Sequence, residues 1–215
     1  MGKSKRTAET KLVPLVKCLE AATDRGRLNL NTVVADWINL SAYTLAFVNG
    51  ANLRQVDLLK QRIDELKKKY DKEQRTLFTQ ALIILGELHE QEPKDWLGQL
   101  TSVANLTENK DGQVFTPDHV SQLMSELLNT SSIIPESICD PCCGTGSLLL
   151  GHIARVREKD QKKVIKMYAC DLDRTALFCA FIQCGLHGVA GVFEVGNTLT
   201  KECFETLYCA PLYHY

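Results

Sequence analysis

The chain has 215 residues, of which 45% are hydrophobic and 24% charged, and its formal net charge is -1. This composition is ordinary for a soluble globular protein with a core of its own, and the near-neutral charge excludes a global electrostatic attraction toward nucleic acid. Any DNA binding would therefore need a local basic patch. The longest apolar runs fall well short of the about 18 residues of a membrane span, and no apolar segment follows the basic residues Lys3, Lys5 and Arg6. We expect a cytoplasmic protein with no membrane contact.

The first 106 residues are predicted to form a helical domain. Apolar residues recur at helical spacing over 7–22 and 28–48, with a turn at 24–26 between them. Residues 56–88 predict one long amphipathic helix or a helical hairpin, interrupted near Glu73. We expect its apolar seam, from Leu59 to Leu88, to bind a second copy or a second subunit. The lysine run 67–69 could touch phosphates, but the acids interspersed with it favour a solvated face.

Residues 107–215 are predicted to form an α/β domain, after a polar and turn-rich boundary at 107–112. Strands are expected near 137–140, 164–170, 191–195 and 205–209. Helices are expected near 117–129, 147–158 and 174–186. Such alternation favours a parallel sheet with right-handed crossovers. A strand order of 3-2-1-4 would place a ligand at the carboxyl ends of strands one and four, where the order reverses.

Nine cysteines raise the question of a metal site or of disulfides. Cys139 and Cys142 form one C-x-x-C pair, yet neither a second such pair nor paired histidines complete a set of four ligands. We therefore expect no metal. Four cysteines in apolar segments are more simply small core residues of a protein in a reducing compartment: Cys170, Cys179, Cys184 and Cys209.

A tight glycine turn follows the first of the expected strands. Residues 138–146 read Ile-Cys-Asp-Pro-Cys-Cys-Gly-Thr-Gly, and Ser147 then opens a helix. Gly144 and Gly146 carry no Cβ, so the backbone can approach a ligand closely, and the helix N-terminus adds unpaired N–H groups. The turn lacks the lysine of a phosphate-binding loop and the three-glycine spacing of a dinucleotide site. It predicts a nucleotide-type site, and argues against a triphosphate or NAD.

The string from Asp140 to Gly146 resembles the S-adenosylmethionine (SAM) loop of N-6 adenine DNA methyltransferases, whose usual form is Asp-Pro-x-Cys-Gly-Thr-Gly. Residues 112–117 resemble the Phe-Thr-Pro element of type I restriction-modification methylation subunits. Residues 93–98 resemble the lead-in of small phage- and plasmid-borne N-6 DNA methylases. The resemblance covers roughly residues 92 to 215. It implies a Rossmann-like methyltransferase sheet, truncated to about half its usual strands, with SAM as cofactor and adenine in duplex DNA as target.

The resemblance also implies which residues bind the cofactor. Asp171 ends the second strand about 25 residues after the glycine turn, which is near the offset of a ribose-binding acid. Asp173 is either a second ligand or an ordinary helix N-cap. Asn197 replaces the family's usual acid that touches adenine, and an amide can still pair with an adenine edge. The expected cofactor-binding residues are Phe115, Thr116, Asp140, Cys142, Gly144, Thr145, Gly146, Asp171, Asp173 and Asn197.

The last residues line up with the family's catalytic Asn-Pro-Pro-Tyr segment but read Ala210-Pro211-Leu212-Tyr213. In the family, the asparagine accepts hydrogen bonds from the target amino group, and the aromatic residue stacks on a flipped base. Ala210 can accept none. The candidate catalytic residues Ala210, Pro211 and Tyr213 therefore form a degenerate motif, and the segment could simply end an edge strand.

Three functions are compatible with these features. The first is an active SAM-dependent adenine methyltransferase that needs a second subunit. The second is a SAM-binding but catalytically silent regulatory protein of a mobile element. The third is a structural module that has lost the cofactor. The intact glycines and Asp171 argue against the third, whereas Ala210, Leu212 and the short sheet argue against the first. The sequence favours a SAM-binding protein with weak or partner-dependent activity.

Overall fold

The computed structural model describes residues 2–24, 26–49, 53–104, 118–128 and 137–210. The helical region contains α1 (Gly2–Ala21), α2 (Leu30–Val48), a short 3-10 helix (Leu53–Gln55), α3 (Val56–Lys67), α4 (Lys72–Gln91) and α5 (Trp96–Val103). Side-chain caps fix three of the helix starts. Asn29, Asp71 and Asp95 accept backbone N–H groups at the starts of α2, α4 and α5. The predicted boundary at 107–112 lies outside the described residues.

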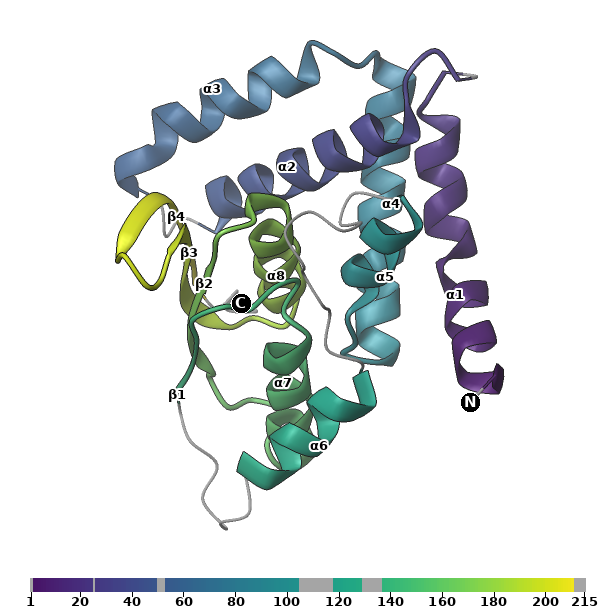
Figure 1. The fold of residues 1–215 in the computed structure, drawn as a ribbon. Helices are drawn as coiled ribbons and strands as arrows, with labels where there is room; N and C mark the ends of the chain where they lie inside the picture. The colour runs from purple at the N-terminus through teal and green to yellow at the C-terminus, as the bar shows by residue number, and fades with distance from the viewer. Residues whose placement is uncertain (1, 25, 50–52, 105–117, 129–136, 211–215) are drawn as a thin grey trace.

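The long amphipathic stretch is two helices, and its seam is buried within the chain. The helix breaks at Lys68–Asp71, slightly before the expected interruption, and Figure 1 shows α3 and α4 meeting at a corner. α3 packs on α2, and α4 packs on α1, so Leu59 and Leu85 are fully covered. The buried residues of the seam, Leu59, Ile63, Ala81 and Leu88, thus have apolar partners in the same chain, and association of a second copy or subunit through the helical region stays a prediction.

The sheet contains β1 (Ser137–Asp140), β2 (Lys166–Asp171), β3 (Ala190–Asn197) and β4 (Glu202–Cys209). The first three strands are parallel, as expected, but the order is β1-β2-β3-β4, and β4 runs antiparallel beside β3. The predicted order 3-2-1-4 is wrong for a physical reason. β4 begins earlier than expected, so only four residues join it to β3. Such a link closes a hairpin, whereas a parallel fourth strand beside β1 needs a crossover of a dozen residues or more.

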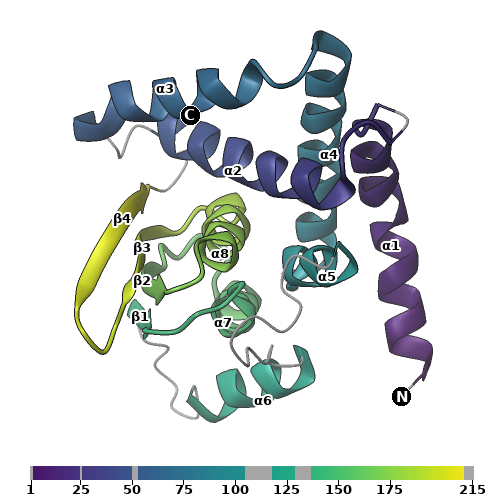
Figure 2. The same cartoon turned by 45° about the horizontal axis from the view of Figure 1, so that its top comes forward.

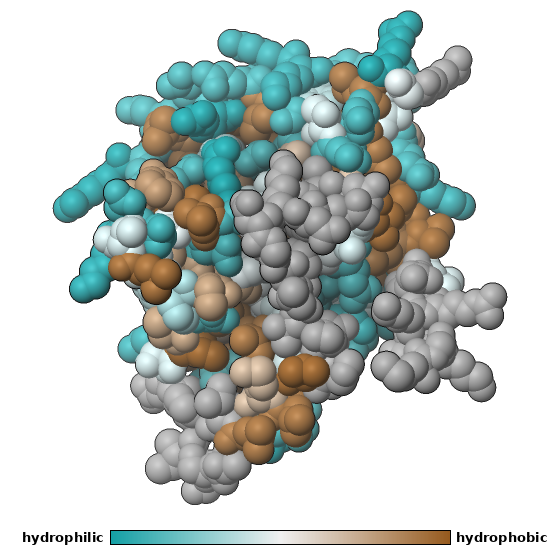
Figure 3. All heavy atoms as spheres, viewed as in Figure 1, coloured by the Kyte–Doolittle hydropathy of each residue, from teal (hydrophilic) through white to brown (hydrophobic). Residues whose placement is uncertain are grey.

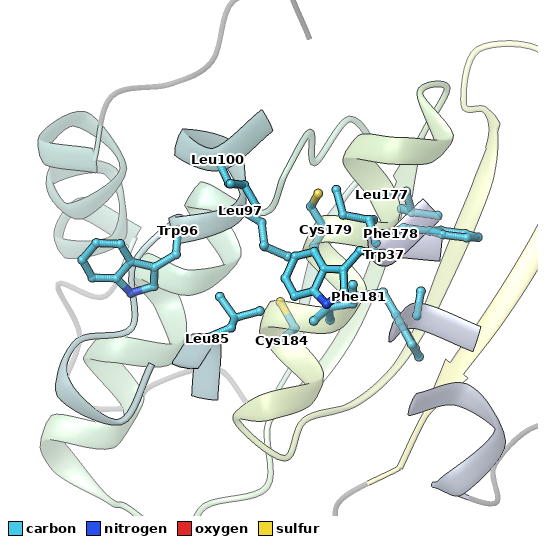
Figure 4. Close-up of a cluster of buried hydrophobic side chains, with 14 of the residues drawn as sticks. Trp37, Leu85, Trp96, Leu97, Leu100, Leu177, Phe178, Cys179, Phe181 and Cys184 are labelled. Carbon is cyan, nitrogen blue, oxygen red and sulfur yellow. The ribbon is translucent and has the colours of Figure 1, made fainter. Parts of the chain in front are cut away.

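Three helices of the second half lie on one side of the sheet (Figures 1 and 2): α6 (Asp118–Leu128), α7 (Ser147–Lys159) and α8 (Arg174–Leu186). α8 is apolar on all sides except for Gln183 and its first turn, and it is enclosed by the sheet, by α7 and by α2, α4 and α5. Its Phe178 and Phe181 are fully buried, and Figure 4 shows them in one cluster with Trp37 and Leu97 of the helical region. A single core therefore joins the helical region to the sheet.

Two histidines meet in this core where α4 and the end of α8 come together. His89 Nδ1 lies 3.1 Å from His187 Nε2, and the rings meet edge to face. Burial, followed by the neighbouring His187, lowers the pKa of His89 to about 3. Burial and the nearby Arg157 guanidinium lower the pKa of His187 to about 4. Both side chains are consequently neutral in the folded protein at pH 7.

This pair predicts a loss of stability in mild acid. Because both folded pKa values lie below the ordinary 6.5, the unfolded chain takes up protons first as the pH falls. The contribution of the two neutral histidines to the free energy of unfolding is complete above about pH 7, and it declines from roughly pH 6.5 toward pH 4. Between pH 7 and pH 5 we expect the free energy of unfolding to fall by about 2 kcal/mol for each histidine. Urea titrations at the two pH values measure the loss, which His187→Gln should reduce by about half. A wild-type stability independent of pH over this range contradicts the prediction.

Candidate nucleotide-binding site

A cavity of about 380 Å³ opens at the carboxyl ends of the three parallel strands. Its walls come from three loops, one after each strand. The strand-to-helix turn after β1, the Asp171-Leu172 step after β2 and the start of the hairpin after β3 therefore meet here. The predicted site residues Cys142, Gly144, Thr145, Asp171 and Asn197 all line this cavity. A position at the strand carboxyl ends is where open α/β sheets bind ligands.

The glycine turn takes a backbone form that only glycine adopts easily. Gly144 has a φ of 55° and Gly146 a φ of 93°, and Gly146 is the N-cap of α7. A Cβ on Gly146 would lie 3.0 Å from the Cβ of Ala180 and 3.1 Å from its Cα. The second glycine therefore lets the turn pass close to α8.

Asp171 is held against this turn by two backbone donors. Gly144 N donates to its Oδ2 at 2.7 Å, and Asp173 N donates to its Oδ1 at 2.9 Å. The carboxylate keeps unused lone pairs on each oxygen, and it lines the cavity. Of the two roles expected for Asp173, the structure shows that of a helix N-cap. It caps α8 by accepting from Thr175 N and Ala176 N, at 2.8 and 3.1 Å.

Asp140 ends β1 with a buried carboxylate that has only one bond among the described residues. Its Oδ1 accepts from Cys142 N at 3.1 Å, whereas the buried Oδ2 has no partner there. Burial raises the pKa of Asp140, the hydrogen bond from Cys142 opposes that rise, and the nearby Asp171 charge adds to it. A buried acid of this kind is stabilised in its charged form by a cation or a hydrogen-bond donor.

The wall that follows β3 is fixed by side-chain bonds. Asn197 Oδ1 accepts from Leu199 N at 3.0 Å and from Thr200 N at 3.2 Å. The hydroxyl of Thr198 donates to the carbonyl of Pro141, which ties this loop to the glycine turn. Leu172 and Leu199 line the cavity although they are 64% and 94% exposed. The cavity thus combines one acid, Asp171, with an uncovered apolar rim.

A buried polar network that sequence reasoning missed supports the turn from behind. Gln183 of α8 is fully buried, and its Nε2 donates to Asp95 Oδ1 and to the carbonyl of Thr145, both at 2.9 Å. Its Oε1 accepts from Leu97 N at 3.0 Å. The Thr145 hydroxyl donates to Asp95 Oδ2. The available signal was one glutamine in a helix that is otherwise apolar on every side, since such a residue must find partners in the core.

Ala210, the one candidate catalytic residue that the structure describes, lies away from the cavity. Ala210 follows Cys209, which pairs with Gly191 at the beginning of β3, six residues before Asn197. At about 3.3 Å per residue, this places the two ends of the strand roughly 20 Å apart. Pro211 and Tyr213 lie outside the described residues, as do Phe115 and Thr116.

In the described part of the chain, no three histidine, cysteine or acidic side chains are grouped closely enough to hold a metal ion. None of its helices combines the length and apolarity required to cross a membrane.

Comparison with known proteins identifies the family. The model of the N-6 DNA Methylase family matches residues 94–210, which is more than half of the chain. The chain therefore belongs to this family, whose cofactor is SAM, and the predicted resemblance is confirmed.

Two curated relatives are methylase subunits of type I restriction enzymes. The MjaVIII subunit of Methanocaldococcus jannaschii is 32% identical over 104 residues, which are 46% of this chain and 17% of that protein. The MpnII subunit of Mycoplasma pneumoniae is 27% identical over 100 residues, 45% of this chain and 18% of that protein. The chain thus spans less than a fifth of the length of the relatives that it matches.

A solved structure, described as a putative class I S-adenosylmethionine-dependent methyltransferase from Listeria monocytogenes, shares 15% identity with this chain. The match covers 85% of this chain and 52% of that one, with a TM-score of 0.44.

Gly146 provides a test of the turn. Gly146→Ala combines a strained φ with a contact against Ala180, whereas Gly26→Ala, at a similar φ of 85°, meets nothing within 4 Å. We expect Gly26→Ala to cost about 1 to 2 kcal/mol, and Gly146→Ala to cost at least about 1 kcal/mol more. Denaturant unfolding of both variants measures the difference. Equal losses would show that Ala180 does not restrict the turn.

The buried network predicts a large loss for Gln183→Leu. This change leaves Leu97 N, the Thr145 carbonyl and one Asp95 oxygen each short of a bond. We expect the free energy of unfolding to fall by about 3 kcal/mol or more, since each buried unsatisfied group costs about 1 to 3 kcal/mol. Gln74→Leu is the matched control, because that buried glutamine also bridges two segments but lies far along the chain from the turn. A loss for Gln183→Leu smaller than that of the control contradicts the prediction.

Proposed function

We propose that the chain binds SAM in the cavity at the carboxyl ends of β1 to β3, as the cofactor-binding part of a DNA adenine-N6 methyltransferase. The observation that carries the proposal is the position of Asp171, fixed by Gly144 N and Asp173 N at the wall of the cavity. A carboxylate held in this way is suited to accept both hydroxyls of a ribose. Family membership supplies the identity of the nucleoside.

Other groups at and beside the cavity suit the remaining parts of the cofactor. Asp140 precedes the lining residue Pro141, and its unpartnered Oδ2 suits the ammonium of the methionine portion, because a buried carboxylate gains most from a positive partner. Leu172 and Leu199 suit the two faces of the adenine, which would cover their exposed apolar surface. The glycine turn, with Cys142 and Thr145, would lie along the part of the cofactor between the methionine portion and the adenine. Phe115 and Thr116 remain proposed ligands on the resemblance alone.

Bound SAM supplies an electrophilic methyl group on its sulfonium. The chain's own contribution to transfer is expected to be small. Ala210 has no amide to accept hydrogen bonds from a target amine, and β4 carries it to the opposite end of the sheet. Loss of one such preorganised acceptor costs about 10² to 10³ in rate. We therefore propose that the chain methylates DNA weakly or only together with a partner. If no partner restores methylation, the alternative is a catalytically silent regulatory protein.

The relatives are named as subunits of restriction enzymes, which supports a function together with further subunits and DNA. Exposed apolar side chains support a surface for such a subunit. Figure 3 shows them gathered over α6, where Leu123, Met124 and Leu127 are exposed. On the helical region, Val13, Ile83 and Val103 are exposed as well.

Calorimetric titration with SAM tests the binding proposal. Asp171→Ala should weaken binding about 10- to 150-fold, because a charged acceptor is lost from the ribose. Asp160→Ala is the matched control. Asp160 Oδ1 accepts from Lys162 N, just as Asp171 Oδ1 accepts from Asp173 N, but Asp160 does not line the cavity. The control variant should therefore leave the affinity for SAM unchanged. Absence of SAM binding at millimolar ligand overturns the proposal. Labelled-methyl transfer to duplex DNA at about 10 per second by the isolated chain would overturn the part concerning catalysis.

A further inference from the structure

The side chain of Asn197 presents only donors to the cavity. Its Oδ1 accepts two backbone N–H groups, from Leu199 and Thr200. A carbonyl oxygen has two lone pairs, so both are used. Backbone N–H groups can only donate, and this fixes which end of the amide faces them. The Nδ2 group is therefore the end left for a ligand, and among the described residues it donates to no protein acceptor.

The surroundings of Asn197 hold this orientation in place. The bond from the Thr198 hydroxyl to the Pro141 carbonyl ties the loop to the glycine turn, so the amide is fixed before any ligand arrives. Asn197 lines the cavity together with the exposed apolar side chains Leu172 and Leu199. A flat apolar ring between these leucines would present its edge to the amide.

We propose that Asn197 selects the cofactor base through a ring-nitrogen acceptor and does not read the exocyclic amine. The inference rests on the proposed SAM site. The edge of adenine beside the amine offers an acceptor at N1 and a donor at N6. A donor-only side chain pairs with the acceptor, whereas an aspartate at this position would pair with the amine. Asn197 would thus donate a hydrogen bond to the base, whereas a carboxylate at this position would accept one from it.

Asn197→Asp tests the polarity directly, because the two side chains have the same shape. One carboxylate oxygen can keep both turn bonds, while the other replaces Nδ2 and turns a donor into an acceptor. The probes are S-adenosylhomocysteine and its 1-deaza analogue, in which C–H replaces N1. Calorimetry on the full chain should show that the wild type binds the analogue about tenfold more weakly, and that Asn197→Asp discriminates less than twofold.

A second measurement does not depend on the variant. In ¹⁵N-labelled wild-type protein, the side-chain NH₂ signal of Asn197 should shift on addition of S-adenosylhomocysteine and shift less with the 1-deaza analogue. Equal affinity of the wild type for both probes overturns the inference and leaves the SAM site standing. The same tenfold discrimination in Asn197→Asp also overturns it. If neither probe binds the wild type, the proposed function fails, and this inference fails with it.

Discussion

The fold depends on how one buried amide is satisfied. Gln183 lies in the middle of a helix that is enclosed on every side, where a polar group without partners costs about 1 to 3 kcal/mol per lost bond. Its bonds go to the start of α5 and to the glycine turn. Apolar packing alone would allow α8 to slide or rotate against its neighbours. The amide removes that freedom, because only one register satisfies all of its bonds.

The cavity follows from this register. The glycine turn is fixed from behind by Asp95 and Gln183, and from the cavity side by Asp171. The loop after β3 is fixed in turn by its bond to Pro141. Each wall of the site is thus held by an interaction whose other end lies in a different element. The helical region contributes to the site through Asp95, although none of its described residues lines the cavity.

Sequence reasoning succeeded where the signal was local. The glycine turn, the strand that ends at Asp171 and the helix 174–186 depend on apolar runs and on φ requirements that neighbouring residues determine. Sequence reasoning failed where contacts between elements distant in the chain determine the structure. The place of β4 depends on where β3 ends and β4 begins, and the four-residue link between them allows a hairpin but no crossover. The partners of Leu59 depended on how α3 packs, and the roles of Asp95 and Gln183 appear only when α5 and α8 meet.

Asp95, Thr145 and Gln183 come from three separate stretches of the chain, yet each satisfies the others. Replacing one of them by an apolar residue leaves a buried carboxylate, hydroxyl or amide without its partner, and that intermediate is less stable than either a complete polar trio or a complete apolar one. Divergence at these positions is therefore expected to be concerted. A helical region transplanted from a homologue would have to bring a compatible residue at position 95, which ties the evolutionary history of the helices to that of the glycine turn.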